Sequence, residues 1–235
     1  MSTPRIGVLL CDDLHEGLDT AWPSYGALFG AMLGDAGPVR SWRFHAGERP
    51  ESVTEADCWV ISGSRADAWA HTGWVGELRE FVAAARDAGQ RLLGVCFGHQ
   101  IVHAALGGRV ARSPQGWGLG IYPVAATRAF GPWAAGEALA LLSVHQDQVL
   151  EPAPGLEGIA AGAFCPHYAS AAPGVLTVQG HPEFDRDFFT ALLPRAGEKA
   201  GAEVERRARA SLDQHDDHAR FGALLRDFAA GHDVI

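Results

Sequence analysis

The sequence has 235 residues, a length that favours one α/β domain with enough buried core to fold without disulfides or a structural metal. Its formal charge of −9 is spread without long runs, which argues against a surface that binds nucleic acid. Its four cysteines are widely separated and form no C-x-x-C pair, which argues against a structural zinc site or a redox couple.

The sequence also bears on where the protein works. No apolar run reaches the roughly 18 residues of a membrane span, and the N-terminus enters a predicted strand without a signal peptide. We therefore expect a soluble, cytoplasmic protein that binds neither membranes nor nucleic acid. Arginine almost entirely replaces lysine, from which we infer no function.

The first hundred residues predict an alternation of strands and helices, because short apolar runs are followed by segments with apolar residues at helical spacing. Strands are predicted over 6–10, 39–45, 57–61 and 92–95, and helices over 25–33, 74–88 and 101–106. Such an alternation implies a parallel sheet with right-handed crossovers. The active site of such a sheet lies at the carboxyl ends of its strands.

The second half of the chain is less regular. A strand is predicted over 121–125, a short helix over 135–142 and a buried strand over 175–179. Residues 186–235 are charged and have a helical pattern. Together, these elements predict a single three-layer α/β sandwich with a mostly parallel central sheet.

One cysteine stands between two glycines where an apolar run ends. Gly94, Cys96 and Gly98 mark a strand, a sharp turn and the start of a helix, which is the plan of a nucleophile elbow. Glycine suits such a turn because a Cβ there would clash with the strand or the helix. The helix N-terminus favours a thiolate, and its N–H groups can hold an oxyanion. Taken alone, the pattern fits a small buried core cysteine equally well.

Two segments of the chain resemble the signatures of the class I (triad) glutamine amidotransferase family. Residues 94–100 read Gly-Val-Cys-Phe-Gly-His-Gln, and residues 178–184 read Val-Gln-Gly-His-Pro-Glu-Phe. The resemblance spans about residues 5–190 and is nearest to stand-alone domains similar to the glutaminase part of GMP synthase. It implies a domain over 1–190 and a C-terminal helical extension, 191–235, packed on the same domain.

The resemblance implies a catalytic triad of Cys96, His181 and Glu183. A cysteine nucleophile needs a base that makes the thiolate, and the base needs a group that orients it. His181 can be the base. Glu183 lies two positions further on, so that on an extended strand it faces the same side and can fix the histidine tautomer.

An oxyanion hole is also implied, formed by the backbone N–H groups of Ser64 and Phe97. Many members of the family have Gly-Gly-Pro where this chain has Gly63-Ser64-Arg65. A backbone donor survives a change of side chain, so Ser64 can still serve. The alternative for this segment is an ordinary β-turn.

The residues expected to bind the substrate are Gly63, Gln100, His145 and Asp147. Gln100 matches the family glutamine that contacts the substrate, and residues 143–149 resemble the family's His-x-Asp-x-Val segment. The alternatives are a helix residue facing solvent for Gln100 and a polar strand end for 143–149.

The implied reaction is attack of Cys96 on the side-chain amide of glutamine. A γ-glutamyl thioester forms, and the products are glutamate and ammonia. The small-molecule substrate is thus glutamine in the first hypothesis, with a synthetase or acceptor protein as a possible partner for the ammonia.

Two alternatives stay open. In the second hypothesis the same triad acts as a γ-glutamyl peptidase or hydrolase on γ-glutamyl amides such as glutathione conjugates. In the third, the chain is a non-catalytic binding module that kept the fold. No metal or organic cofactor is implied, because no cluster of ligand residues stands out beyond the triad.

Overall fold

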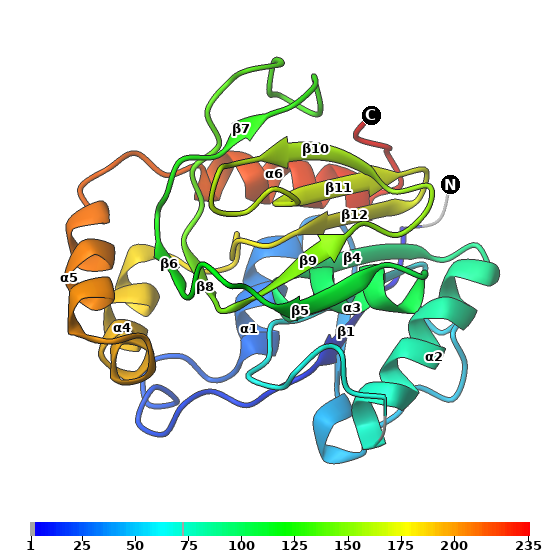
Figure 1. Ribbon diagram of the computed structural model, residues 1–235. Helices are drawn as coiled ribbons and strands as arrows, with labels where there is room; N and C mark the ends of the chain where they lie inside the picture. Colours follow the sequence, from blue (N-terminus) through cyan, green and yellow to red (C-terminus); the bar gives the residue numbers. More distant parts are fainter. Residues whose placement is uncertain (1–2, 72) are drawn as a thin grey trace.

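A computed structural model describes residues 3–71 and 73–235 (Figure 1). Within them, a sheet of eight strands has the order β2-β1-β3-β4-β12-β11-β10-β7. Its parallel strands are β1 (Ile6–Leu10), β2 (Val39–Arg43), β3 (Cys58–Ile61), β4 (Arg91–Val95) and β12 (Val175–Val178). The strands that continue it antiparallel are β11 (Ala169–Ala172), β10 (Glu157–Ala161) and β7 (Ala125–Ala126). The expected α/β fold with a mostly parallel central sheet is confirmed.

Helices cover both faces of this sheet (Figure 1). On one face lie α1 (Tyr25–Leu33) and α6 (His218–Ala229); on the other lie α2 (Gly73–Asp87) and α3 (Phe97–Ala105). Successive side chains of a strand point to opposite faces of the sheet, so that each strand contributes to the core on both sides. Val8 packs on the first face, and its neighbour Leu9 packs on the second. None of the helices in the described ranges has the length and apolarity to cross a membrane.

Two short antiparallel pairs and two further helices complete the fold. The pairs are β5 (Arg109–Arg112) with β9 (Asp147–Glu151), and β6 (Gly118–Gly120) with β8 (Ser143–His145). Asp185 is the N-cap of helix α4 (Arg186–Ala200), and its side chain accepts from Phe188 N at 2.7 Å. Helix α5 (Ala202–Ser211) packs on α4 and β6, and a 3₁₀ turn spans Phe44–Ala46.

The expected boundary at residue 190 falls inside α4, which runs on to Ala200. Helices α4 and α5 pack with Phe184 and Leu119 in one apolar cluster, whereas α6 packs against α1. The division into a domain over 1–190 and an extension over 191–235 stays a prediction.

Two elements predicted for the middle of the chain are wrong. Residues 121–124 are not a strand: β6 ends at Gly120, and Ala125 starts the separate β7, after Pro123, which has no N–H to donate. Residues 135–142 form no helix. Gly136 has a φ of +81°, and Leu139 N donates to Val124 O at 3.0 Å. Pairing with this neighbouring segment overrides the helical propensity of the alanines.

The turn between β4 and α3 confirms the elbow geometry. Cys96 has φ 53° and ψ −106°, and among the described residues it is the one non-glycine with a positive φ. A Cβ on Gly94 would lie 2.6 Å from Gly98 O, and a Cβ on Gly98 would clash with Ile61 O. Close backbone approach therefore requires glycine on both sides of the cysteine.

Gly98→Ala should destabilise the fold, because the added methyl group has no room between α3 and β3. Overpacking of this kind costs about 1–3 kcal/mol, so we expect a lower urea midpoint than in the wild type. Gly30→Ala in α1 is the matched control, because nothing lies within 4 Å of its added Cβ. It should be neutral or slightly stabilising, since alanine is the better helix former. Equal midpoints for Gly98→Ala and the wild type would contradict the close approach.

Candidate active site

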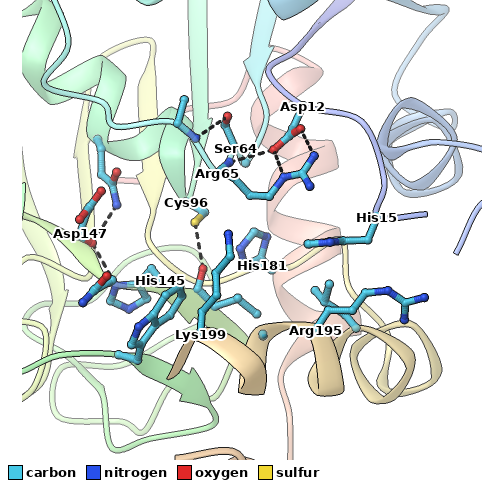
Figure 2. Close-up of a pocket in the computed structure, with 18 of the residues that line it drawn as sticks. Asp12, His15, Ser64, Arg65, Cys96, His145, Asp147, His181, Arg195 and Lys199 are labelled. Atoms are coloured by element: carbon cyan, nitrogen blue, oxygen red, sulfur yellow. Dashed lines mark hydrogen bonds and ion pairs between the residues drawn. The ribbon is translucent and has the colours of Figure 1, made fainter. Parts of the chain in front are cut away.

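A pocket of about 420 Å³ opens at the carboxyl ends of β1, β3 and β4 (Figure 2). The sequence-predicted residues Gly63, Ser64, Cys96, Gln100, His145, Asp147 and His181 all line it. The rest of its lining comes from the loop after β1, the start of α1, the segment after Ser64, the β5–β6 and β8–β9 regions, and α4 with the turn before it. These residues are Asp12, His15, Tyr25, Arg65, Ala66, Asp67, Arg112, Trp117, Val144, Gln146, Phe184, Leu192, Arg195, Ala196 and Lys199.

His181 and Glu183 form a buried pair at the end of β12. The Nδ1–H of His181 donates to Glu183 Oε1 at 2.8 Å, and both residues are at most 5% exposed. The imidazole stacks on Phe184, with ring centroids 4.1 Å apart and planes 5° from parallel. The carboxylate thus fixes the tautomer, and the phenylalanine fixes the ring plane.

The thiol of Cys96 lies close to the same ring (Figure 2). A Cβ on Gly63 would come within 2.9 Å of His181 Cε1 and 3.8 Å of Cys96 Cβ. Gly63, expected to bind the substrate, therefore also leaves the room in which the cysteine and the histidine stand together. The thiol itself lies 3.6 Å from Val144 O and 3.6 Å from Gln179 Nε2.

The pKa of His181 depends on its burial and on its two neighbours, Cys96 and Glu183. Burial works to lower its pKa. The charges of Cys96 and Glu183, and the hydrogen bonds to both, outweigh burial and raise the pKa of His181. The arrangement therefore favours the protonated imidazole of His181 beside Cys96, the form that can stabilise a negative sulfur.

Two backbone N–H groups border the thiol. Phe97 is the first residue of α3, so its N–H has no partner within the helix. Ser64 lies in the pocket wall, where its side chain accepts from Ala66 N at 3.1 Å. Among the described hydrogen bonds, neither of these backbone N–H groups is a donor. Both are available to a developing oxyanion.

The remaining residues expected to bind the substrate, Gln100, His145 and Asp147, are linked to one another and to their neighbours by hydrogen bonds. Gln100 donates from Nε2 to Asp147 O at 2.8 Å and to Gln179 Oε1 at 3.1 Å. His145 donates from Nδ1 to Asp147 O at 3.0 Å and accepts from the Tyr122 hydroxyl at 2.6 Å. Burial lowers the pKa of His145 to about 4, which keeps it neutral.

The carboxylate of Asp147 pairs with Arg112 at 3.3 Å. Burial raises its pKa, although Arg112 acts in the opposite direction. In the part of the chain that the structure describes, no group of three or more His, Cys, Asp or Glu residues is placed to hold a metal ion.

Sequence reasoning missed several residues that line the pocket or, like Gln179, contact the Cys96 thiol from behind the lining. Gln179 lies inside the second motif, two positions before His181, and that position could have drawn attention to it. Tyr25 lies far from either motif in the sequence, whereas Arg195 and Lys199 lie on α4, the helix that follows the second motif; packing of these helices brings all three residues to the pocket. No local signal points to them.

Comparison with known proteins agrees with this geometry. Residues 39–196 match the family model described as glutamine amidotransferase class-I. The chain is 30% identical to γ-glutamyl peptidase 4 of Arabidopsis thaliana over 84% of its own length and 83% of that protein's. The chain therefore belongs to the class I glutamine amidotransferase family.

Solved structures show the same fold. A glutamine amidotransferase from Thermotoga maritima superposes with a TM-score of 0.74 at 14% identity, covering 99% of this chain and 100% of that one. A candidate GMP synthase component from Thermoplasma acidophilum gives 0.57 at 15% identity, covering 91% and 100%. The resemblance to this family and to the glutaminase part of GMP synthase is confirmed at the level of fold.

The charge of Cys96 is the first of the contributions that raise the pKa of His181. Cys96→Ala should therefore lower the pKa of His181, measured from the ¹⁵N shifts of its ring in a pH titration. Cys165→Ala, which removes another buried thiol, is the control and should leave the His181 titration in place. An unchanged pKa of His181 in Cys96→Ala would show that the two side chains do not act as a pair.

Proposed function

We propose that the chain hydrolyses γ-glutamyl amide bonds through a γ-glutamyl thioester on Cys96. The observation that carries this proposal is the cysteine of a nucleophile elbow standing against the buried His181–Glu183 pair in one pocket. A non-catalytic module has no need of a cysteine held at a positive φ beside a buried, oriented histidine.

In the first half of the reaction, Cys96 Sγ attacks the γ-carbonyl carbon. The oxyanion that forms is held by the N–H groups of Phe97 and Ser64. The C–N bond then breaks, the amine leaves with the proton of the His181 imidazolium, and the thioester remains on Cys96. Glu183 keeps the imidazole in the tautomer that can give and take this proton.

In the second half, a water molecule attacks the thioester carbonyl. His181 takes a proton from this water, the C–S bond breaks, and Cys96 leaves as a thiolate. Free glutamate is the product of this step. The enzyme returns to its starting ionisation state without a metal or an organic cofactor.

The substrate class includes glutamine, whose leaving group is ammonia, and γ-glutamyl peptides, whose leaving group is an amino acid or a peptide. Similarity to γ-glutamyl peptidase 4 over most of both chains supports the peptides. The pocket also continues from Cys96 along α4, which gives room to a leaving group larger than ammonia. With glutamine as substrate, a synthetase or acceptor protein would be the partner that uses the ammonia.

A reducing compartment suits this chemistry, because a thiolate nucleophile is lost on oxidation. The four cysteines are free thiols. We therefore propose that the protein works in the cytoplasm.

The test is glutamate release from glutamine and from γ-glutamyl peptides by the purified protein. Glu183→Gln should lower kcat about 10²- to 10⁴-fold with little change in KM, because it disturbs the tautomer and charge of His181 rather than contacts with the substrate. A purely raised KM would remove Glu183 from the proton transfer.

Two cysteine variants, one in the pocket and one outside it, serve as the test and its control in this assay. Cys96→Ala should show no turnover while keeping its fold, judged by circular dichroism. Cys58→Ala makes the same change in β3, at the end of the sheet opposite the pocket, and should remain active. Turnover retained by Cys96→Ala would overturn the mechanism.

A further inference from the structure

The charged residues that line the pocket are mostly paired with one another. Arg65 pairs with Asp12 across the loop after β1. Arg112 pairs with both Asp67, at 3.1 Å, and Asp147, at 3.3 Å. Both arginines on the sheet side of the pocket are thus engaged by carboxylates, and with three aspartates to two arginines this side carries no free positive charge.

Helix α4 contributes two cations that no carboxylate of the lining balances. Arg195 and Lys199 are one helical turn apart, and both line the pocket. Arg195 donates to two carbonyl oxygens, Ala191 O at 3.0 Å and Glu16 O at 2.7 Å. Lys199 makes no hydrogen bond or ion pair with any residue that the structure describes, and Figure 2 shows its side chain extending from α4 into the pocket.

Lys199 is also the only lysine in the sequence. In a chain with a formal charge of −9, these two cations in the lining of the pocket make the α4 side locally positive, which attracts anions. His15, which lies between Arg65 and Arg195 in Figure 2, responds to this field. Burial lowers its pKa first, and the charges of Arg65, Arg195 and Lys199 act in the same direction, against Asp12.

The two walls of the pocket differ in charge, a difference that can orient a substrate with charged groups at both ends. On the side of Asp147, Arg112 and Gln100, both signs of charge and an amide are present. That mixture fits the α-amino and α-carboxylate groups of a glutamyl moiety. On the side of α4 the free charge is positive only, which fits a carboxylate alone.

We propose that Lys199, with the added charge of Arg195, binds a carboxylate on the leaving group of the substrate. The preferred substrates are then γ-glutamyl peptides with a free C-terminal carboxylate, rather than glutamine, whose leaving group carries no charge of this kind. This inference rests on the proposed function and names its substrate class. Cleavage of such a peptide by water gives glutamate and an amino acid or shorter peptide with a free amine.

The test compares substrates that differ by one charge. The probes are γ-glutamylglycine and γ-glutamylcysteinylglycine, each supplied as the free acid and as the C-terminal amide. A charge-assisted hydrogen bond should make kcat/KM of the wild type about 10- to 100-fold higher for the acid than for the amide of at least one pair.

Lys199→Gln should reduce this acid-to-amide ratio toward one, mainly through KM of the acid, and Lys199→Arg should restore much of it. Arg207→Gln is the matched control. It removes one positive charge from α5, where Arg207 is two-thirds exposed and does not line the pocket, so the ratio should stay that of the wild type.

Two results would overturn the inference alone. One is a wild type that hydrolyses acids and amides equally well. The other is a Lys199→Gln variant that loses as much on the amides as on the acids, because the lysine would then bind the glutamyl part that both share. No turnover of any γ-glutamyl compound would overturn the proposed function, and this inference with it.

Discussion

The structure depends on the close approach of α3 to the strands beneath it. Gly98 leaves no room for a Cβ against the Ile61 carbonyl, and Gly94 leaves little against Gly98. This approach drives the backbone of Cys96 to a φ of 53°, a conformation that costs of the order of 1–3 kcal/mol in a non-glycine residue. As a result, the Cys96 thiol projects from the carboxyl end of the sheet into the pocket, toward which the first N–H groups of α3 also point.

Burial strengthens the interactions between the charged groups of the site. His181 and Glu183 lie almost out of reach of water, so each depends on the other, and removing one would leave an unpaired buried charge. The charged residues in the walls of the pocket differ in whether they are paired. The pairs of Arg65 and Arg112 cancel their charges locally, whereas the two cations of α4 do not. The sheet and α3 thus fix the position of Cys96, the proposed nucleophile, and α4, the helix that follows the second motif, carries the residues of the proposed selectivity.

Local pattern was enough to predict much of this molecule. The alternation of apolar runs and helical segments gives the parallel half of the sheet, and the glycines around Cys96 give the elbow. The spacing of His181 and Glu183 gives the pair that the structure joins at 2.8 Å. Each of these features is encoded within a few neighbouring residues.

For features that depend on contacts between residues distant in the sequence, our predictions were wrong or absent. Residues 135–142 look helical by composition, yet they run beside 124–126 because that segment offers backbone partners. Lys199 lies 103 positions after Cys96 and 15 after Phe184, and the helical pattern that carries it does not itself indicate a pocket. Its place follows from the packing of α4 around Phe188 and Leu192, which only the folded chain reveals.

The most direct test of this account is to trap the acyl-enzyme. The protein would be mixed with a γ-glutamyl peptide, quenched in acid during turnover, digested and examined by mass spectrometry. The account predicts one γ-glutamyl group on the peptide that carries Cys96, lost on treatment with hydroxylamine, as a thioester would be. Steady turnover with no adduct, or an adduct on another residue, would contradict it.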